Sequence, residues 1–242
     1  KQANSLIKTR VNPILPTRMK SPYVRHSSDI MLGVRRNRLN RPLEYFFEDE
    51  VKSEFGSRSF DIRGIPARDI LHWFEELEPS DWFRRSPELD KEISRRFFET
   101  LQAAAVCELA AWRKSIDGRL AEIIVLDQFS RNVFRGMPQA FHQDPLALAL
   151  AQEAVAADLH LELQGSKRAF LLMPYMHSES LIIHEVAMEL FTAAGLEGNL
   201  RSEKQHFELL QRFGRYPRRN KALGRTNTAE EIVYLSNTSG QF

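Results

Sequence analysis

The sequence has a single cysteine and no long apolar stretch in its 242 residues. One cysteine cannot form an internal disulfide, which excludes the small disulfide-stapled scaffolds of secreted proteins and fits a reducing compartment. Because Cys107 follows the apolar run 103–106, we expect it to lie buried in a helix as a small hydrophobic residue. No run approaches the ~18 apolar residues that a membrane-spanning helix needs, so we expect no transmembrane segment.

Strand signals are also missing, and from residue 67 onward the apolar residues recur with helical spacing. Residues 86–88, Ser-Pro-Glu, are typical of a helix start, and residues 228–231 match a capping box. The sequence predicts helices at about residues 67–77, 86–114, 119–134, 144–158, 174–194, 199–213 and 228–236, with a short piece at 166–172. These elements predict an all-α fold, either a helical-hairpin (tetratricopeptide-like) array or a bundle.

The positive charge is concentrated at the N-terminus. Residues 1–46 hold ten Lys or Arg against two Asp or Glu, a net charge of +8, whereas the whole chain carries +2. Four prolines and the lack of periodicity predict an extended, irregular basic arm there, followed by a linker at 47–66 and an all-helical domain at 67–242. The arm residues that we expect to contact a polyanion are Lys8, Arg10, Arg18, Lys20, Arg25, Arg35, Arg36, Arg38 and Arg41.

A basic arm on a mildly acidic body is typical of a tail that binds a polyanion. Neutralisation of phosphates gives such a tail affinity for RNA that does not depend on base sequence. The basic, serine-containing and acid-poor composition also resembles an organelle-targeting region, or the residues just after one. The sequence therefore predicts that residues 1–46 contact rRNA or an acidic protein.

The first polar motif is LDQFSRN, at residues 126–132. On a helix, Asp127 and Arg131 lie four residues apart on one face, with Asn132 beside them. In a functional interpretation Asp127 orients Arg131, which binds an anion. In a structural interpretation the two residues form an internal ion pair at a helix end, and the sequence leaves both open.

The second motif is MPYMHSE, at residues 173–179. If Pro174 opens a helix, His177 and Glu179 lie at its N-terminus, where free N–H groups favour anions. His177 titrates near neutrality, so it is a candidate acid, base or ligand, and Glu179 is a second catalytic candidate. A buried, hydrogen-bonded His177 at a packing junction is the alternative. The histidines lack the spacing of a helical zinc site, and we expect neither a metal nor another cofactor.

The third motif, residues 212–226, is rich in arginine and contains two glycines and a proline. Guanidinium groups suit bidentate contacts with phosphate or carboxylate, although arginines also tie loops to the carboxyl ends of helices. Together the three motifs predict one polar site assembled from distant parts of the chain. The candidate ligand-binding residues are Asp127, Arg131, Asn132, Arg215, Arg219, Asn220 and Arg225.

The same motifs, in this order, resemble the bacterial domain-of-unknown-function family numbered 924, whose members are all-helical and tetratricopeptide-like. The resemblance spans about residues 67–242 and also rests on His206. Ser130 stands where the family usually has proline, and Arg218 where it usually has histidine. If that histidine belongs to an active constellation, the change puts any activity of this chain in doubt. The resemblance implies a fold and no established chemistry, and it does not cover the arm.

Several functions are compatible with these features. The basic arm and Arg218 favour a non-enzymatic structural or assembly subunit of a large complex, first of all an organellar (mitochondrial) ribosome or other ribonucleoprotein. That function places the protein in the mitochondrial matrix, with the cytoplasm as the alternative location. An accessory subunit of a respiratory or other inner-membrane complex fits similarly, since basic arms also dock onto acidic proteins and anionic lipid.

Two further alternatives use the helical domain itself. One is an enzyme or binding protein for a small anionic ligand at Arg131, His177 and Arg219, and the other is a helical array with a peptide-binding groove. The sequence has no nucleophile motif, glycine-rich phosphate loop or metal signature, and it therefore favours a protein without enzymatic activity.

Overall fold

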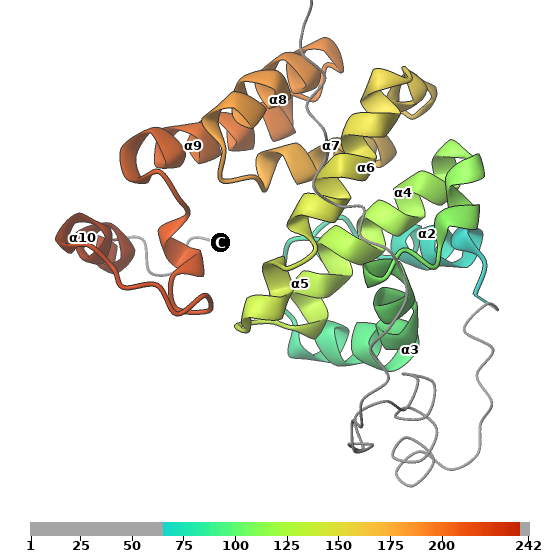
Figure 1. The fold of residues 1–242 in the computed structure, drawn as a ribbon, viewed down its shortest axis with the longest axis horizontal. Helices are drawn as coiled ribbons and strands as arrows, with labels where there is room; N and C mark the ends of the chain where they lie inside the picture. Colours follow the sequence, from blue (N-terminus) through green and yellow to red (C-terminus); the bar gives the residue numbers. More distant parts are fainter. Residues whose placement is uncertain (1–64, 238–242) are drawn as a thin grey trace, which may run out of the picture. The chain divides into compact units, whose positions relative to one another are not determined.

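The computed structural model describes residues 65–237, and within that range it contains helices and turns but no strand (Figure 1). The predicted all-α fold is therefore confirmed. The α-helices are α2 (Ala67–Glu75), α3 (Pro87–Ala105), α4 (Ile116–Ile124), α5 (Ser130–Val133), α6 (Asp144–Ala156), α7 (Gly165–Met176), α8 (Leu181–Ala193), α9 (Glu197–Phe213) and α10 (Ala229–Asn237).

From α6 to α9, helices that follow one another in the chain pack side by side, as in a helical-hairpin array, whereas α2 to α5 pack on the next helix but one. Helix α6 packs on α7, α7 on α8, and α8 on α9, while α2 packs on α4 and α3 on α5. The basic arm at 1–46 and almost all of the linker at 47–66 lie outside the described residues. Across residues 65–237, no helix combines the length and apolarity that crossing a membrane requires.

The centre of the core is α4 with the turn that follows it. Leu120, Ile123, Val125 and Leu126 are completely buried there. Each such side chain stabilises the fold by roughly 1.5–3 kcal/mol relative to exposure, before entropy is counted. The rings of Trp73, Phe97 and Phe129 pack against this centre with centroids 4.9 to 5.7 Å apart. Polar groups carried by this segment are consequently held on a rigid support.

The helix predicted at 86–114 ends earlier, at Ala105. Cys107 adopts a left-handed conformation, with φ of 63°, and its N–H donates to the carbonyl of Ala104. The N–H of Glu108 donates to the carbonyl of Ala103, which completes a Schellman motif with cysteine in the position that glycine usually takes. The motif turns Cys107 outward, so the predicted burial of this residue is wrong.

The helix predicted at 119–134 is interrupted by a π-helical turn at Val125–Phe129, between α4 and α5. A π-helical turn adds a residue to the helical circuit, and such turns occur often at functional sites. This one contains Asp127, whose side chain is only 1% exposed. The predicted placement of Asp127 and Arg131 on one face is nevertheless confirmed, because their side chains lie 3.1 Å apart.

Pro174 does not open a helix, as the sequence predicts, but lies in the last turn of α7. His177 is the C-cap of that helix, and α8 begins only at Leu181. The prediction that His177 lies at the N-terminus of a helix is therefore wrong, because the residue ends α7. Pro174 has no N–H to donate to the carbonyl four residues earlier, so α7 continues past it against the local preference of proline, while the side chains of residues 169–176 are all buried.

Candidate functional site

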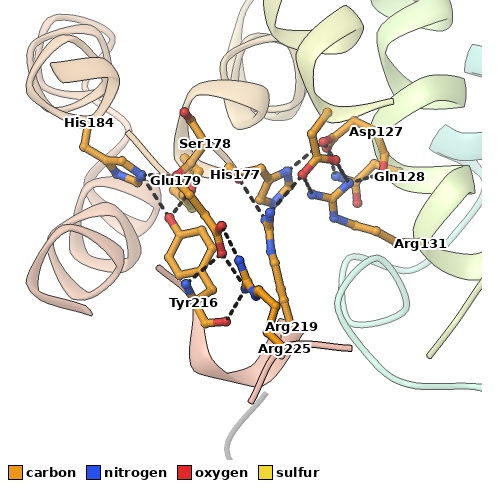
Figure 2. Close-up of polar contacts among 12 residues, drawn as sticks. Asp127, Gln128, Arg131, His177, Ser178, Glu179, His184, Tyr216, Arg219 and Arg225 are labelled. Carbon is orange, nitrogen blue, oxygen red and sulfur yellow. Dashed lines mark hydrogen bonds and ion pairs between the residues drawn. The ribbon is translucent and has the colours of Figure 1, made fainter. Parts of the chain in front are cut away.

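The imidazole of His177 faces the carboxylate of Asp127, with 2.7 Å between Nδ1 and Oδ1 (Figure 2). Asp127 comes from the π-helical turn and His177 from the end of α7, fifty residues later. The other carboxylate oxygen, Oδ2, accepts from Gln128 Nε2 at 2.6 Å. Gln128 Nε2 also lies 3.4 Å from the sulfur of Met173, a residue of the second motif. The first two sequence motifs thus meet in space.

The two sides of the His177 ring have different surroundings. An ionised Asp127 can only accept, so Nδ1 carries the proton of a neutral imidazole. The other nitrogen, Nε2, has no hydrogen-bond partner within residues 65–237, and the side chain is 16% exposed. Nε2 is therefore the nitrogen with a lone pair available to a substrate or a water molecule.

Burial and neighbouring charges favour this protonation state. Burial opposes ionisation of Asp127, but the charges and hydrogen bonds of Arg131, His177 and Gln128 outweigh it and hold the pKa of the carboxyl well below its usual range. Burial lowers the pKa of His177, Arg131 lowers it further, and Asp127 opposes both only in part. Near neutral pH the pair is thus a carboxylate beside a neutral imidazole.

Arg131 supports the pair from the side of Asp127. Its Nη1 donates to the backbone carbonyl of Asp127 at 2.7 Å and lies 3.1 Å from Oδ1 of the same residue. Its guanidinium group also binds Asp144, the first residue of α6, with both oxygens at 2.9 and 3.1 Å. Such fork-like arginine–carboxylate contacts are geometrically specific, so Asp144 fixes the plane of the Arg131 guanidinium.

Arg219, from the third motif, closes the network. Its Nη1 donates to Asp144 Oδ2 at 3.0 Å and its Nη2 to the backbone carbonyl of His177 at 2.8 Å. Contacts therefore run from the His177 ring through Asp127, Arg131, Asp144 and Arg219 back to the His177 backbone. The two guanidinium charges are matched by two carboxylates, so this five-residue ring is neutral when the imidazole is neutral.

Two aromatic rings contact the guanidinium group of Arg219. The guanidinium carbon lies 4.7 Å from the ring centroid of Phe141 and 4.7 Å from that of Tyr216. Arg131 also approaches Phe141, at 5.8 Å. Cation–π contacts of this kind add about 0.5–2 kcal/mol each, depending on exposure. The arginines of the site are thus fixed by packing as well as by charge.

Glu179, the second catalytic candidate, is occupied elsewhere (Figure 2). Its carboxylate accepts from both terminal nitrogens of Arg225, at 2.7 and 2.9 Å, and from the N–H of Tyr216 at 2.8 Å. These contacts join the turn after α7 to the C-terminal segment. The structure places Glu179 and Arg225 in a tether beside the ring and not in the ring itself.

Three other predicted site residues also serve local contacts. Asn132 donates to Asp90 on α3, at 2.8 Å. Asn220 donates to Asn227, also at 2.8 Å, within the C-terminal segment. Arg215 binds both oxygens of Glu231 and the carbonyl of Thr226. These partners lie outside the five-residue ring, and the contacts match the structural alternative, in which such side chains tie loops together.

The structure adds Asp144 to the site and shows a second buried pair near it. Asp144 was interpreted only as the start of a helix, because nothing local links it to arginines 13 and 75 residues away. A second buried pair, His184 and Glu203, also lies nearby, and both side chains are completely buried. His184 Nε2 contacts the Tyr216 hydroxyl at 2.9 Å, and this hydroxyl donates to the carbonyl of Met176. Tyr216 thus connects the second pair to Arg219, whose guanidinium carbon lies 4.7 Å from the centroid of the Tyr216 ring.

No group of three His, Cys, Asp or Glu side chains within residues 65–237 has an arrangement that could hold a metal ion. An ionised carboxylate orients a neutral imidazole whose second nitrogen is accessible, which is the arrangement that general-base catalysis uses.

Comparison with known proteins adds two findings. The family described as "Bacterial protein of unknown function (DUF924)" matches residues 70–239. A solved protein of unknown function from Agrobacterium tumefaciens, ATU0120, is 34% identical, with a TM-score of 0.67. The match covers 71% of this chain and 97% of the Agrobacterium chain. No curated protein matches the sequence.

These matches correct the predicted function and location. The mitochondrial ribosomal or ribonucleoprotein subunit, the respiratory-complex subunit and the mitochondrial matrix location are wrong, because both matches are to bacterial proteins and neither is to a ribosomal or complex subunit. The error came from giving weight to the charge of residues 1–46, which lie outside the family match. The predicted family is confirmed, and the chain belongs to the bacterial protein family DUF924.

Proposed function

We propose that the protein is an enzyme in which Asp127 and His177 act together as a general base. The observation that carries the proposal is the 2.7 Å contact between Asp127 Oδ1 and His177 Nδ1, with Nε2 left accessible. The sequence favoured a protein without enzymatic activity because it has no nucleophile motif, glycine-rich phosphate loop or metal signature, and an orienting carboxylate for His177 is not apparent from the sequence. The fold supplies that carboxylate from the π-helical turn.

In the proposed step, His177 Nε2 takes a proton from a water molecule or a substrate hydroxyl, whose oxygen then attacks an electrophilic carbon or phosphorus atom. Asp127 keeps the proton on Nδ1 and stabilises the imidazolium that forms. The proton on Nε2 is later given to the leaving group, so the histidine returns to its neutral state. Positioned acid–base groups of this kind accelerate reactions by roughly 10²- to 10⁴-fold.

The charge balance of the ring limits the substrate. Arg131 and Arg219 already bind the carboxylate of Asp144. An anionic ligand would have to compete with that carboxylate for the same guanidinium groups. We therefore expect the reacting part of the substrate to be small, polar and uncharged, such as an ester, a lactone or an amide.

The test is a hydrolysis screen with the full chain. Wild-type protein is compared with His177→Ala, Asp127→Asn and the control His72→Ala, whose side chain is 78% exposed on α2. The panel contains small uncharged esters, lactones and amides, together with phosphate and carboxylate analogues of each. We expect activity in wild type and in the control, and at least a 100-fold loss in the other two variants.

A chemical probe tests the site without a known substrate. Diethyl pyrocarbonate acylates the unprotonated nitrogen of accessible histidines, so His177 should react at neutral pH, and peptide mapping would locate the adduct. Equal turnover in wild type and His177→Ala, or a His177 that stays unmodified while His72 reacts fully, would overturn the proposal.

A further inference from the structure

We infer that Arg219 is a positioning residue for His177, and this inference rests on the proposed function of the Asp127–His177 pair. Among the described residues, Arg219 forms its hydrogen bonds with Asp144 and with the backbone of His177, and none with the imidazole. Its Nη2 donates to the backbone carbonyl of His177 at 2.8 Å, while Asp127 holds the side chain of the same residue at Nδ1. The histidine is thus fixed at two points, one on its imidazole and one on its backbone.

The backbone contact matters because of where His177 lies. As the C-cap of α7, its carbonyl belongs to the last groups of a helix, which have no partner in the helical ladder. Helix ends fray unless such carbonyls find another donor. Arg219 is the donor here, so it holds the backbone from which the imidazole projects.

Arg219 can serve this role because its own position is restricted on three sides. Its Nη1 donates to Asp144, and the rings of Phe141 and Tyr216 lie on its guanidinium group. The Tyr216 hydroxyl is in turn held by the carbonyl of Met176, next to His177. These contacts orient the guanidinium group so that its Nη2 faces the backbone carbonyl of His177.

A second set of contacts connects Arg219 to His177 through the other residues of the five-residue ring. Arg219 and Arg131 share the carboxylate of Asp144, and Arg131 holds both the backbone and the side chain of Asp127. Loss of Arg219 would leave Asp144 bound to Arg131 alone. The orientation of Asp127 would then lose part of its support at the same time as the backbone of His177.

Arg219 also links the site to the C-terminal segment. It lies in the 3₁₀ turn Pro217–Arg219, between Tyr216 and Arg225, which Glu179 binds. The first two motifs therefore supply the Asp127–His177 pair. The third motif supplies Arg219, which binds the backbone of His177. This gives the arginine-rich motif a role in placing the base, without contact to the substrate.

The experiment follows the Nδ1 proton of His177 by ¹H–¹⁵N NMR of the histidine side chains in the full chain. The variants are Arg219→Met, Arg219→Lys and Asp127→Asn, with Arg212→Met as the matched control. Arg212 likewise pairs with a carboxylate, Glu230, and lies over an aromatic ring, Phe213, but it contacts none of the ring residues. The thermal unfolding midpoint of each variant is measured in parallel.

We expect the Nδ1 proton to be protected in wild type and in Arg212→Met, and to exchange with solvent more than about tenfold faster in Arg219→Met. Arg219→Lys keeps one cationic donor and should recover part of the protection. Where a substrate has been found, Arg219→Met should lower kcat more than it raises KM. A loss of stability alone would move the midpoint and leave the exchange rate in the folded state unchanged.

Two results would overturn the inference. One is an exchange rate in Arg219→Met equal to wild type while Asp127→Asn changes it, which would leave the Asp–His pair intact without need of Arg219. The other is the same change in Arg219→Met and Arg212→Met. Failure of the proposed function is recognised separately, since it appears as turnover that survives His177→Ala, whatever the exchange rates show.

Discussion

The carboxylate of Glu179 accepts hydrogen bonds from both terminal nitrogens of the Arg225 guanidinium group, at 2.7 and 2.9 Å. The same carboxylate accepts the N–H of Tyr216. Glu179 therefore anchors the segment that brings Arg219 to the site. We expect Glu179→Ala to lower the free energy of unfolding by about 2 kcal/mol, measured by urea denaturation, because three donors lose their acceptor.

The control for this variant is Glu230→Ala. Glu230 also binds an arginine, Arg212, but both side chains are more than half exposed. Exposed ion pairs contribute little, so this variant should unfold almost as wild type does. Equal destabilisation of the two variants would show that the Glu179 tether has no special role.

Gly118 and Gly198 provide a paired test of helix packing. A Cβ atom on Gly118 would lie 1.9 Å from the backbone oxygen of Trp112, a contact that only backbone movement can relieve. Gly118→Ala should therefore destabilise the protein by about 3 kcal/mol or more, since the added methyl group overpacks the site and the backbone has to move to accommodate it. A Cβ atom on Gly198 in α9 meets only the end of Arg201, at 4.0 Å.

At Gly198 the helical preference of alanine should dominate. Gly198→Ala is expected to stabilise the protein by about 0.5–1 kcal/mol, by reducing the entropy of the unfolded chain and favouring the helix. Thermal and urea unfolding of both variants under the same conditions give the comparison. A Gly118→Ala protein as stable as wild type would contradict the packing seen between α4 and the preceding turn.

The third prediction concerns the ion pair of Arg113 and Glu122, which lies away from the site. Glu122 is completely buried on α4, and Arg113 binds both of its oxygens at 2.6 and 2.7 Å. Arg113→Leu leaves the carboxylate without its partner and should cost about 3–5 kcal/mol of unfolding free energy. The double variant Arg113→Leu, Glu122→Leu should be less destabilised than Arg113→Leu alone, because no charge is left buried. Urea denaturation of the three proteins tests this order.

Local signals were enough to predict some elements of the fold. In the capping box at the start of α10, the Thr228 N–H donates to Glu231 Oε2 at 2.7 Å and the Glu231 N–H donates to Thr228 Oγ1 at 3.2 Å. Both contacts join residues three apart, so the sequence contains all the information that they need. The i, i+4 relation of Asp127 and Arg131 could be predicted for the same reason.

The remaining features depend on contacts between distant segments. The π-helical turn that holds Asp127 cannot be read from periodicity, because it is stabilised by the completely buried core around it. Pro174 was taken for a helix start, since propensity alone gives no reason for it to sit in the last turn of α7. Asp144 enters the site only through Arg131 and Arg219, which the fold brings to it from two other motifs.

The last prediction concerns acid stability and is centred on His206. Burial, with smaller contributions from the nearby charges of His177, His184 and Arg219, lowers the pKa of His206 to about 4, although a hydrogen bond to the carbonyl of Ser202 opposes the shift. The unfolded chain, with a histidine pKa near 6.5, then binds a proton that the native state does not. The free energy of unfolding should therefore fall as the pH drops from about 6.5 to about 4.

Each such histidine can contribute up to about 1.4 kcal/mol per pH unit within that window. His177, whose pKa is also lowered, acts in the same direction. We measure the free energy of unfolding by urea denaturation at several pH values between 4 and 7.5. The slope of this free energy against pH should be smaller for His206→Gln than for wild type. His72→Gln, which removes a largely exposed imidazole on α2, should leave the slope unchanged. A slope that is the same in His206→Gln and wild type would show that the native state protonates His206 as readily as the unfolded chain does.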